Sequence, residues 1–97
     1  MLTRTDANQN TIVHALRDLQ FKVIDLHKVG GGVPDILVMG YSMIQDRTTV
    51  LLVEIKTESG KLNRAQKEWH YAVKGEFRDA PVLVARDLSE ILEWFGR

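Results

Sequence analysis

Apolar side chains recur along the chain with two different periods. Three stretches have them at the spacing of a helix, whereas four short runs are rich in Val, Ile and Leu and indicate strands. The helical stretches are residues 5–19, the residues after Asn63 and the residues after Asp87; the strands are residues 21–26, 35–39, 48–56 and 80–85. The predicted order is α-β-β-β-α-β-α, which indicates an α/β protein with a mixed β-sheet flanked by helices.

Short polar residues mark the predicted helix starts. Thr5 or Asp6 is expected to cap the first helix, and Asn63, with Gln66 three residues later, has the spacing of a capping box for the second. The predicted buried faces are Ile12, Val13, Leu16 and Leu19 in the first helix and Ala65, Trp69, Ala72 and Val73 in the second.

The hairpin loop predicted at residues 40–47 is unusually apolar. It contains Tyr41, Met43 and Ile44 among turn-forming residues. An exposed apolar loop is typical of a surface that meets a partner. The same residues are equally compatible with a loop that folds back over the sheet.

A charged pair interrupts the most apolar strand. The apolar run over residues 50–55 is continuous, which indicates a strand covered on both faces. Glu54 lies within that run and Lys56 follows it, so their side chains project to the same side. A buried charge is costly unless it is paired or bound to metal. Asp35, at the start of the preceding strand, is placed to lie beside them.

Two carboxylates and a lysine at one place suit a magnesium-dependent phosphodiesterase. The alternative for Glu54 and Lys56 is a buried structural ion pair, and an isolated Asp35 is also typical of a turn. The three residues together favour the catalytic interpretation.

Composition limits the class of protein. The chain has 97 residues, enough for one small domain, which we expect to span residues 1–97. Its 13 basic and 13 acidic residues cancel, so any affinity for DNA must come from local basic patches or from a metal. Without cysteine, disulfides and thiolate metal sites are excluded. No apolar run is long enough to span a membrane and no signal peptide is recognised, so a cytoplasmic protein is expected, in a bacterium or a phage-infected cell.

Three motifs in order resemble one known family. They are Gly32-Val33-Pro34-Asp35, Val53-Glu54-Ile55-Lys56 and Leu62-Asn63-x-x-Gln66-x-x-Trp69. Together they resemble the VRR-NUC (virus-type replication-repair nuclease) domain, a branch of the restriction-endonuclease-like PD-(D/E)XK superfamily. The likeness spans nearly the whole chain, and its compact size is similar to the stand-alone phage members.

The resemblance implies a role for each site residue. Asp35, Glu54 and the carbonyl of Ile55 would hold Mg²⁺, with Mn²⁺ as a substitute and no small-molecule cofactor. Lys56 would orient the attacking water or balance charge on the phosphate. Gln66 would approach the site from the second helix, although it is also expected to form the capping box.

The start of the first helix departs from the family pattern. Family members commonly carry a glutamate there, whereas this chain has Asp6 and Gln9 as the possible substitutes. The same Asp6 is also expected as a helix cap, which is the more common use of an aspartate at that position. One or two metal ions are therefore both compatible with the sequence.

The resemblance also implies a substrate. The expected activity is a DNA endonuclease, selective for branched DNA such as Holliday junctions and acting as a homodimer. The alternatives are a sequence-specific or nonspecific duplex nuclease and a non-catalytic DNA-binding subunit with a nuclease fold. The candidate DNA-binding residues are Lys28, Gly31, Lys61, Arg64 and Lys67.

Overall fold

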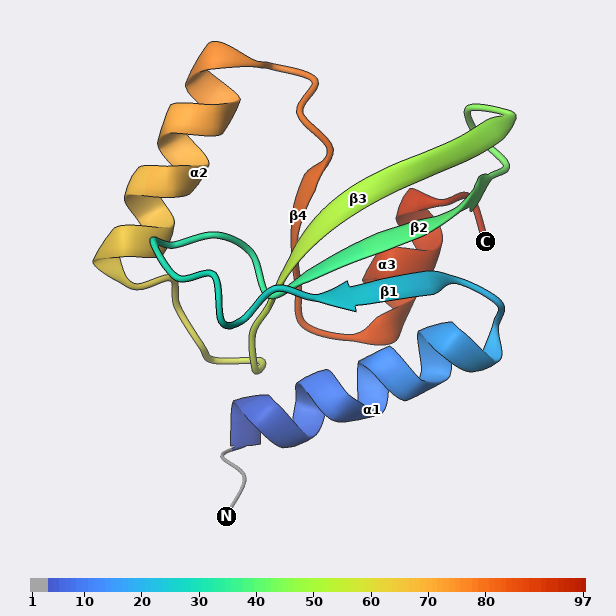
Figure 1. The fold of residues 1–97 in the computed structure, drawn as a ribbon, viewed down its shortest axis with the longest axis horizontal. Helices are drawn as coiled ribbons and strands as arrows, with labels where there is room; N and C mark the ends of the chain where they lie inside the picture. Colours follow the sequence, from blue (N-terminus) through green and yellow to red (C-terminus); the bar gives the residue numbers. More distant parts are fainter. Residues whose placement is uncertain (1–3) are drawn as a thin grey trace.

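The structure is a computed structural model that describes residues 4–97, with side chains from residue 7 onward. Its elements follow the predicted order (Figure 1). They are α1 (Arg4–Asp18), β1 (Lys22–Asp25), β2 (Ile36–Ser42), β3 (Arg47–Ile55), α2 (Arg64–Glu76), β4 (Val82–Ala85) and α3 (Leu88–Trp94).

The strands form one mixed sheet in the order β1-β2-β3-β4. The pairs β1–β2 and β2–β3 are antiparallel, and β3–β4 is parallel. The parallel pair is possible because α2 and its loops provide the long crossover between β3 and β4. The α/β class and the mixed sheet flanked by helices are thereby confirmed.

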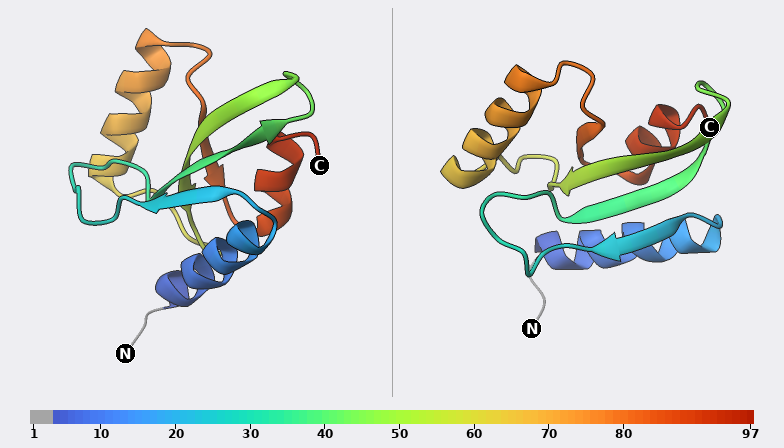
Figure 2. Two further views of the ribbon diagram at one scale, coloured as in Figure 1. Left: turned by 45° about the vertical axis from the view of Figure 1, so that its right-hand side comes forward. Right: turned by 45° about the horizontal axis from the view of Figure 1, so that its top comes forward.

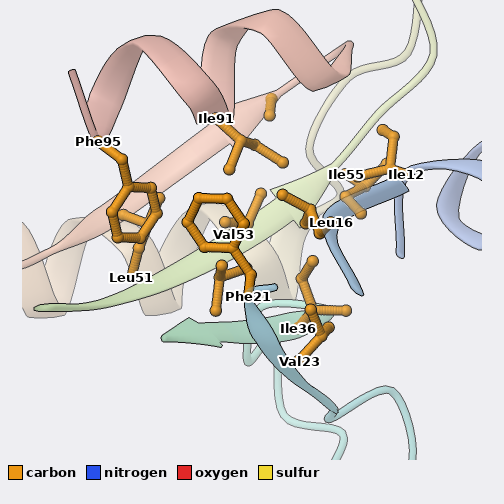
Figure 3. Packing of buried hydrophobic residues seen from close by; sticks show 12 residues of the cluster. Ile12, Leu16, Phe21, Val23, Ile36, Leu51, Val53, Ile55, Ile91 and Phe95 are labelled. Carbon is orange, nitrogen blue, oxygen red and sulfur yellow. The ribbon is translucent and has the colours of Figure 1, made fainter. Parts of the chain in front are cut away.

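Helices α1 and α3 cover one face of the sheet, which we call the covered face (Figure 3). Leu16, Ile91 and Phe95 from the helices are completely buried there. They pack on alternate strand residues, which are Val23, Ile36, Val38, Leu51, Val53 and Ile55. The aromatic rings of Phe21 and Phe95 meet with centroids 4.9 Å apart. This face holds the hydrophobic core.

The opposite face, which we call the open face, is only partly covered. Helix α2 stands to one side of it (Figures 1 and 2), and no α2 residue belongs to the core cluster of the described residues. Ile24 and Met39 on this face remain 55% and 39% exposed. The expectation that residues 50–55 are covered on both faces is therefore wrong for Val50 and Leu52, which are only partly buried, and holds for Glu54.

The predicted buried face of α2 is also wrong. Ala65 and Ala72 are exposed, Trp69 and Val73 are partly buried, and His70 is the buried residue of the helix. The periodic apolar pattern predicted the helix correctly. The helix lies beside the sheet, however, and does not pack against the hydrophobic core.

Two expectations for α1 need correction. The helix already includes Thr5 and Asp6, so neither is its N-cap, and their side chains lie outside the described residues. Leu19 is 44% exposed, not buried. The helix ends at Asp18 and Gln20 adopts a left-handed φ of 72°, which turns Phe21 into the core in place of Leu19.

The β2–β3 hairpin loop is shorter than predicted. Gly40, Tyr41 and Ser42 continue β2, and the turn covers residues 43–46. A Cβ atom on Gly40 would lie 2.3 Å from the Phe21 ring, so glycine makes room for that ring inside the strand and does not mark a loop. Met43 and Ile44 are 65% and 70% exposed, which excludes the alternative that they fold back over the sheet.

Candidate active site

Asp35 and Glu54 are brought together by the β2–β3 register. Ile36 pairs with Val53, so Asp35 at the entrance of β2 lies opposite Glu54 near the end of β3. The Ile55 backbone N–H donates a 2.8 Å hydrogen bond to Asp35 Oδ2 and fixes that carboxylate beside the strand. The Glu54 side chain projects to the open face and is only 1% exposed. The sequence placed this pair correctly.

The surroundings of the Glu54 side chain disfavour its ionised form. Burial, followed by a hydrogen bond and charge repulsion from Asp35, raises the pKa of Glu54 from 4.5 to about 8, and the Lys56 charge opposes this rise. Its Oε1 atom is buried without a hydrogen-bond partner among the described residues. Without a cation, Glu54 therefore keeps its proton at neutral pH.

This arrangement fits a divalent metal ion. Two adjacent carboxylates are both ionised when a cation neutralises them, and carboxylate and carbonyl oxygens are the ligands that Mg²⁺ prefers. The N–H and C=O of one strand residue point to the same side, so the Ile55 carbonyl is directed towards Asp35 as its N–H is. The Ile55 side chain is buried in the core, which leaves only its backbone for the site.

A third acidic ligand is not part of the described site. No group of three or more His, Asp or Glu side chains converges in the part of the chain whose side chains are described. Gln9 is partly buried on α1, and the side chain of Asp6 lies outside that part. Among the described side chains, the carboxylates at the site are those of Asp35 and Glu54.

Lys56 lies at the end of β3, on the same side of the strand as Glu54. Its backbone N–H donates to the Ala85 carbonyl of β4 at 3.0 Å, and its side chain is partly buried. Between these two described side chains no ion pair within 4.0 Å forms; the pairs present are His27–Asp25 and Arg64–Glu68. Among the described side chains, the ammonium group therefore has no salt-bridge partner.

Two residues at the site were missed by sequence reasoning. Asn8 of α1 donates 3.4 Å hydrogen bonds to the carbonyls of Lys56 and Arg86. The Arg86 guanidinium donates to the carbonyls of Thr57 and Gly60 and so holds the loop that follows the site. Asn8 had a signal, because it precedes Ile12 by four residues and continues the inward stripe of α1. Arg86 had none.

Gln66 is confirmed in the capping box. Its N–H donates to Asn63 Oδ1 at 2.9 Å, and its Oε1 accepts from the Asn63 N–H at 2.8 Å. The side-chain NH₂ group of Gln66 is not used by the capping box and is the part left for contact with a substrate. A Cβ atom on Gly32 would come within 2.2 Å of the Ala65 carbonyl oxygen. The start of α2, which carries Gln66, therefore lies against the loop that leads to Asp35.

The candidate DNA-binding residues lie in separate places. Lys61 and Lys67 line one cavity beside α2, whereas Lys28 lines another with Asp25 and His27. Arg64 is largely exposed and pairs with Glu68 at 3.1 Å. Gly31 has a left-handed φ of 68° and open space around it.

Comparison with known families supports the nuclease interpretation. The family model of the VRR-NUC domain matches residues 3–86, which include all three motifs. Comparisons with curated proteins and with solved structures yield no significant match. Within the described residues, no helix is both long and apolar enough to cross a membrane. With its paired carboxylates on a restriction-endonuclease-like sheet, the chain belongs to the VRR-NUC family and is a nuclease of the PD-(D/E)XK type.

Proposed function

We propose that residues 1–97 form one DNA endonuclease domain that hydrolyses phosphodiester bonds with Mg²⁺, or Mn²⁺, held by Asp35, Glu54 and the Ile55 carbonyl. One observation carries the proposal. Glu54 is 1% exposed, has an oxygen without a partner among the described residues and lies against Asp35, in a chain that belongs to a nuclease family. A cation at this position satisfies both carboxylates.

The residues divide the chemistry between them. A bound metal supplies positive charge that polarises the scissile phosphate and lowers the pKa of the attacking water. Asp35 is oriented for ligation by the Ile55 N–H, and Glu54 by its place inside the strand. The Lys56 ammonium group orients the water or stabilises charge that develops on the phosphate. The amide of Gln66 contacts the same phosphate region.

Charge-removing substitutions test the metal site. We expect Asp35→Asn and Glu54→Gln to abolish magnesium-dependent cleavage while the protein stays folded, because the side chains keep their shape but lose the charge that binds metal. Glu58→Gln is the matched control, since Glu58 is an exposed carboxylate four residues further along the chain. Junction cleavage and thermal unfolding are measured on the same preparations. Cleavage retained by a folded Glu54→Gln variant would remove Glu54 from the site.

Lys56→Met separates a catalytic from a structural lysine. The methionine stem packs similarly, but the cation is lost. We expect DNA binding in Ca²⁺ to change little and the rate in Mg²⁺ to fall by about 10²-fold or more. A rate within severalfold of the unmodified protein would reduce Lys56 to a structural counter-charge.

We further propose that the enzyme acts on branched DNA as a homodimer. A four-way junction offers two equivalent strands related by a two-fold axis, and a two-fold dimer places one active site at each. The exposed side chains of Tyr41, Met43 and Ile44 support a partner surface near the hairpin turn.

Light scattering during chromatography gives the mass in solution, and a cruciform plasmid distinguishes paired cuts from single nicks. A monomer that only nicks would overturn the dimeric resolvase. Equal cleavage of linear duplex and four-way junction would favour a duplex nuclease. Binding without cleavage in Mg²⁺ or Mn²⁺ would indicate a non-catalytic DNA-binding subunit.

A further inference from the structure

We propose that the cavity beside α2 binds an unpaired segment of the DNA strand next to the active site, with a base stacked on Tyr71. The proposal rests on the DNA endonuclease function above and specifies a feature of its substrate. We call this cavity the basic groove. Its volume is about 510 Å³, and it is lined by Lys61, Leu62, Lys67, His70, Tyr71, Lys74 and Arg86.

The groove concentrates positive charge in a chain without net charge. Among its described lining residues, four are Lys or Arg and none is Asp or Glu, although acidic and basic residues are equal in number over the whole sequence. His70 adds no cation near neutral pH, since burial and then the charges of Lys74 and Lys56 lower its pKa. A neutral protein that gathers lysines on one concave surface favours a polyanion there.

The groove is connected to the active site. Arg86 lines it and holds the Thr57 and Gly60 carbonyls, in the loop that begins directly after Lys56. The lining residues Lys67, Tyr71 and Lys74 are spaced three or four apart and so share one face of α2, while Arg86 directly follows β4. The groove therefore lies between that face of α2 and the end of β4. A DNA strand whose phosphate lies at Asp35 and Glu54 is therefore continuous with this surface.

The exposed ring of Tyr71 favours single-stranded over duplex DNA in the basic groove. Its side chain is 78% exposed among the lysines, although an aromatic ring of this size is usually buried. Lysines alone suffice to hold the phosphates of a duplex, in which the bases are already stacked on one another. An exposed ring between lysines is typical of surfaces that hold single strands, because each unpaired base offers a face for stacking.

The test compares two aromatic residues of the same helix region. Fluorescence anisotropy in Ca²⁺ measures binding to a blunt duplex and to the same duplex with a single-stranded arm. We expect Tyr71→Ala to weaken binding of the armed DNA about tenfold and to leave duplex binding within twofold. Tyr71→Phe keeps the stacking face and should bind as the unmodified protein does. Phe77→Ala is the matched control, since Phe77 is 63% exposed at the end of α2 and outside the groove.

Salt dependence tests the lysines. Replacing Lys67 and Lys74 together by Gln should reduce the slope of log affinity against log salt by about 1.4 for the armed DNA, which corresponds to two phosphate contacts on a single strand. Lys22→Gln, an exposed lysine on β1 outside the groove, should leave the slope unchanged.

The proposal is overturned if Tyr71→Ala binds the armed DNA as tightly as the unmodified protein does. It is also overturned if that variant loses armed and blunt DNA equally. A failure of the proposed nuclease function would appear in the cleavage assays instead. Either the Asp35→Asn variant would still cleave DNA, or the unmodified protein would not cleave it. Because binding in Ca²⁺ is measured without cleavage, the two failures are distinguishable.

Discussion

The two faces of the sheet differ in what covers them and in what they carry. The covered face meets α1 and α3 and contributes completely buried residues such as Val53 and Ile55. The open face is left partly exposed at Ile24 and Met39, yet it buries Glu54 to 1% exposure beside Asp35. Adjacent residues of a single strand thus serve opposite purposes, since Val53 and Ile55 stabilise the fold while Glu54 destabilises it in the absence of metal.

Helix α2 stands beside the open face and is held by local contacts. Its capping box joins Asn63 and Gln66, and its first turn lies against Gly32. Its lysines and Tyr71 line the basic groove, and no residue of this helix enters the core cluster described for the chain. The core therefore lies on the covered face, whereas the carboxylate pair projects to the open face.

The largest difference between the faces is expected for truncation of apolar side chains. Phe95→Ala should lower the free energy of unfolding by about 3–5 kcal/mol, because Phe95 is completely buried and stacks against Phe21. Ile24→Ala on the open face should cost less than about 1 kcal/mol, because Ile24 is 55% exposed. Urea denaturation measures both. Equal losses would mean that the open face is covered in solution, by a partner or a second copy.

Glu54→Gln should stabilise the metal-free protein at high pH. The folded pKa of Glu54 is about 8 against 4.5 for the ordinary carboxyl, so the unfolded chain releases this proton first as pH rises. Below pH 4.5 Glu54 is protonated in both states and its charge costs no stability. The cost appears as pH rises above 4.5 and is complete above about pH 8. At pH 9 the variant should be more stable by on the order of 2–4 kcal/mol, and near pH 4.5 the two proteins should be alike.

Thermal unfolding in EDTA across this pH range measures the effect. Adding Mg²⁺ should raise the melting temperature of the unmodified protein only, because a ligand stabilises the state that binds it. A Glu54→Gln variant with an unchanged pH profile would mean that the carboxylate is solvated in the free protein.

The sequence predicted that Asp35 lies beside Glu54, for physical reasons that need little tertiary information. Side chains alternate between the two faces of a strand, so Glu54 projects away from the face that Val53 and Ile55 share. The short hairpin between β2 and β3 fixes the register that brings Asp35 opposite Glu54. The Asn63–Gln66 capping box is a local interaction and needs no tertiary information.

Features that depend on long-range packing were not predictable. Glycine is a residue typical of turns, yet Gly40 continues β2, and the ring of Phe21 occupies the space of its missing side chain. The pattern of α2 placed Trp69 in a core that this helix does not reach, and it gave no signal for the burial of His70. Arg86 holds two carbonyls from a loop 26 and 29 residues earlier, a contact that no local motif encodes.

Two neighbouring glycines test how α2 is attached. Gly32→Ala should destabilise by about 2 kcal/mol or more, because φ is +82° and a Cβ atom would overlap the backbone of Ala65. Gly31→Ala has the same left-handed backbone but open space, so about 1 kcal/mol is expected. Amide exchange should show the Gly32→Ala effect concentrated in α2. Equal costs for both variants would remove the Gly32–Ala65 contact from the attachment of the helix.

The smallest expected effect lies within α2 and has the opposite sign. Gly75 is in the last turn, its φ is not in the left-handed region and nothing lies within 4 Å of its missing Cβ. Gly75→Ala should therefore stabilise the helix by about 0.5–1 kcal/mol, and Ala72→Gly, at another exposed position of α2, should destabilise it by a similar amount. If α2 opens independently of the core, amide exchange in α2 changes in both variants while the urea midpoint of the whole protein hardly moves. A matching shift of the global midpoint would show that α2 unfolds together with the covered face, and the separation of the two faces in stability would then be wrong.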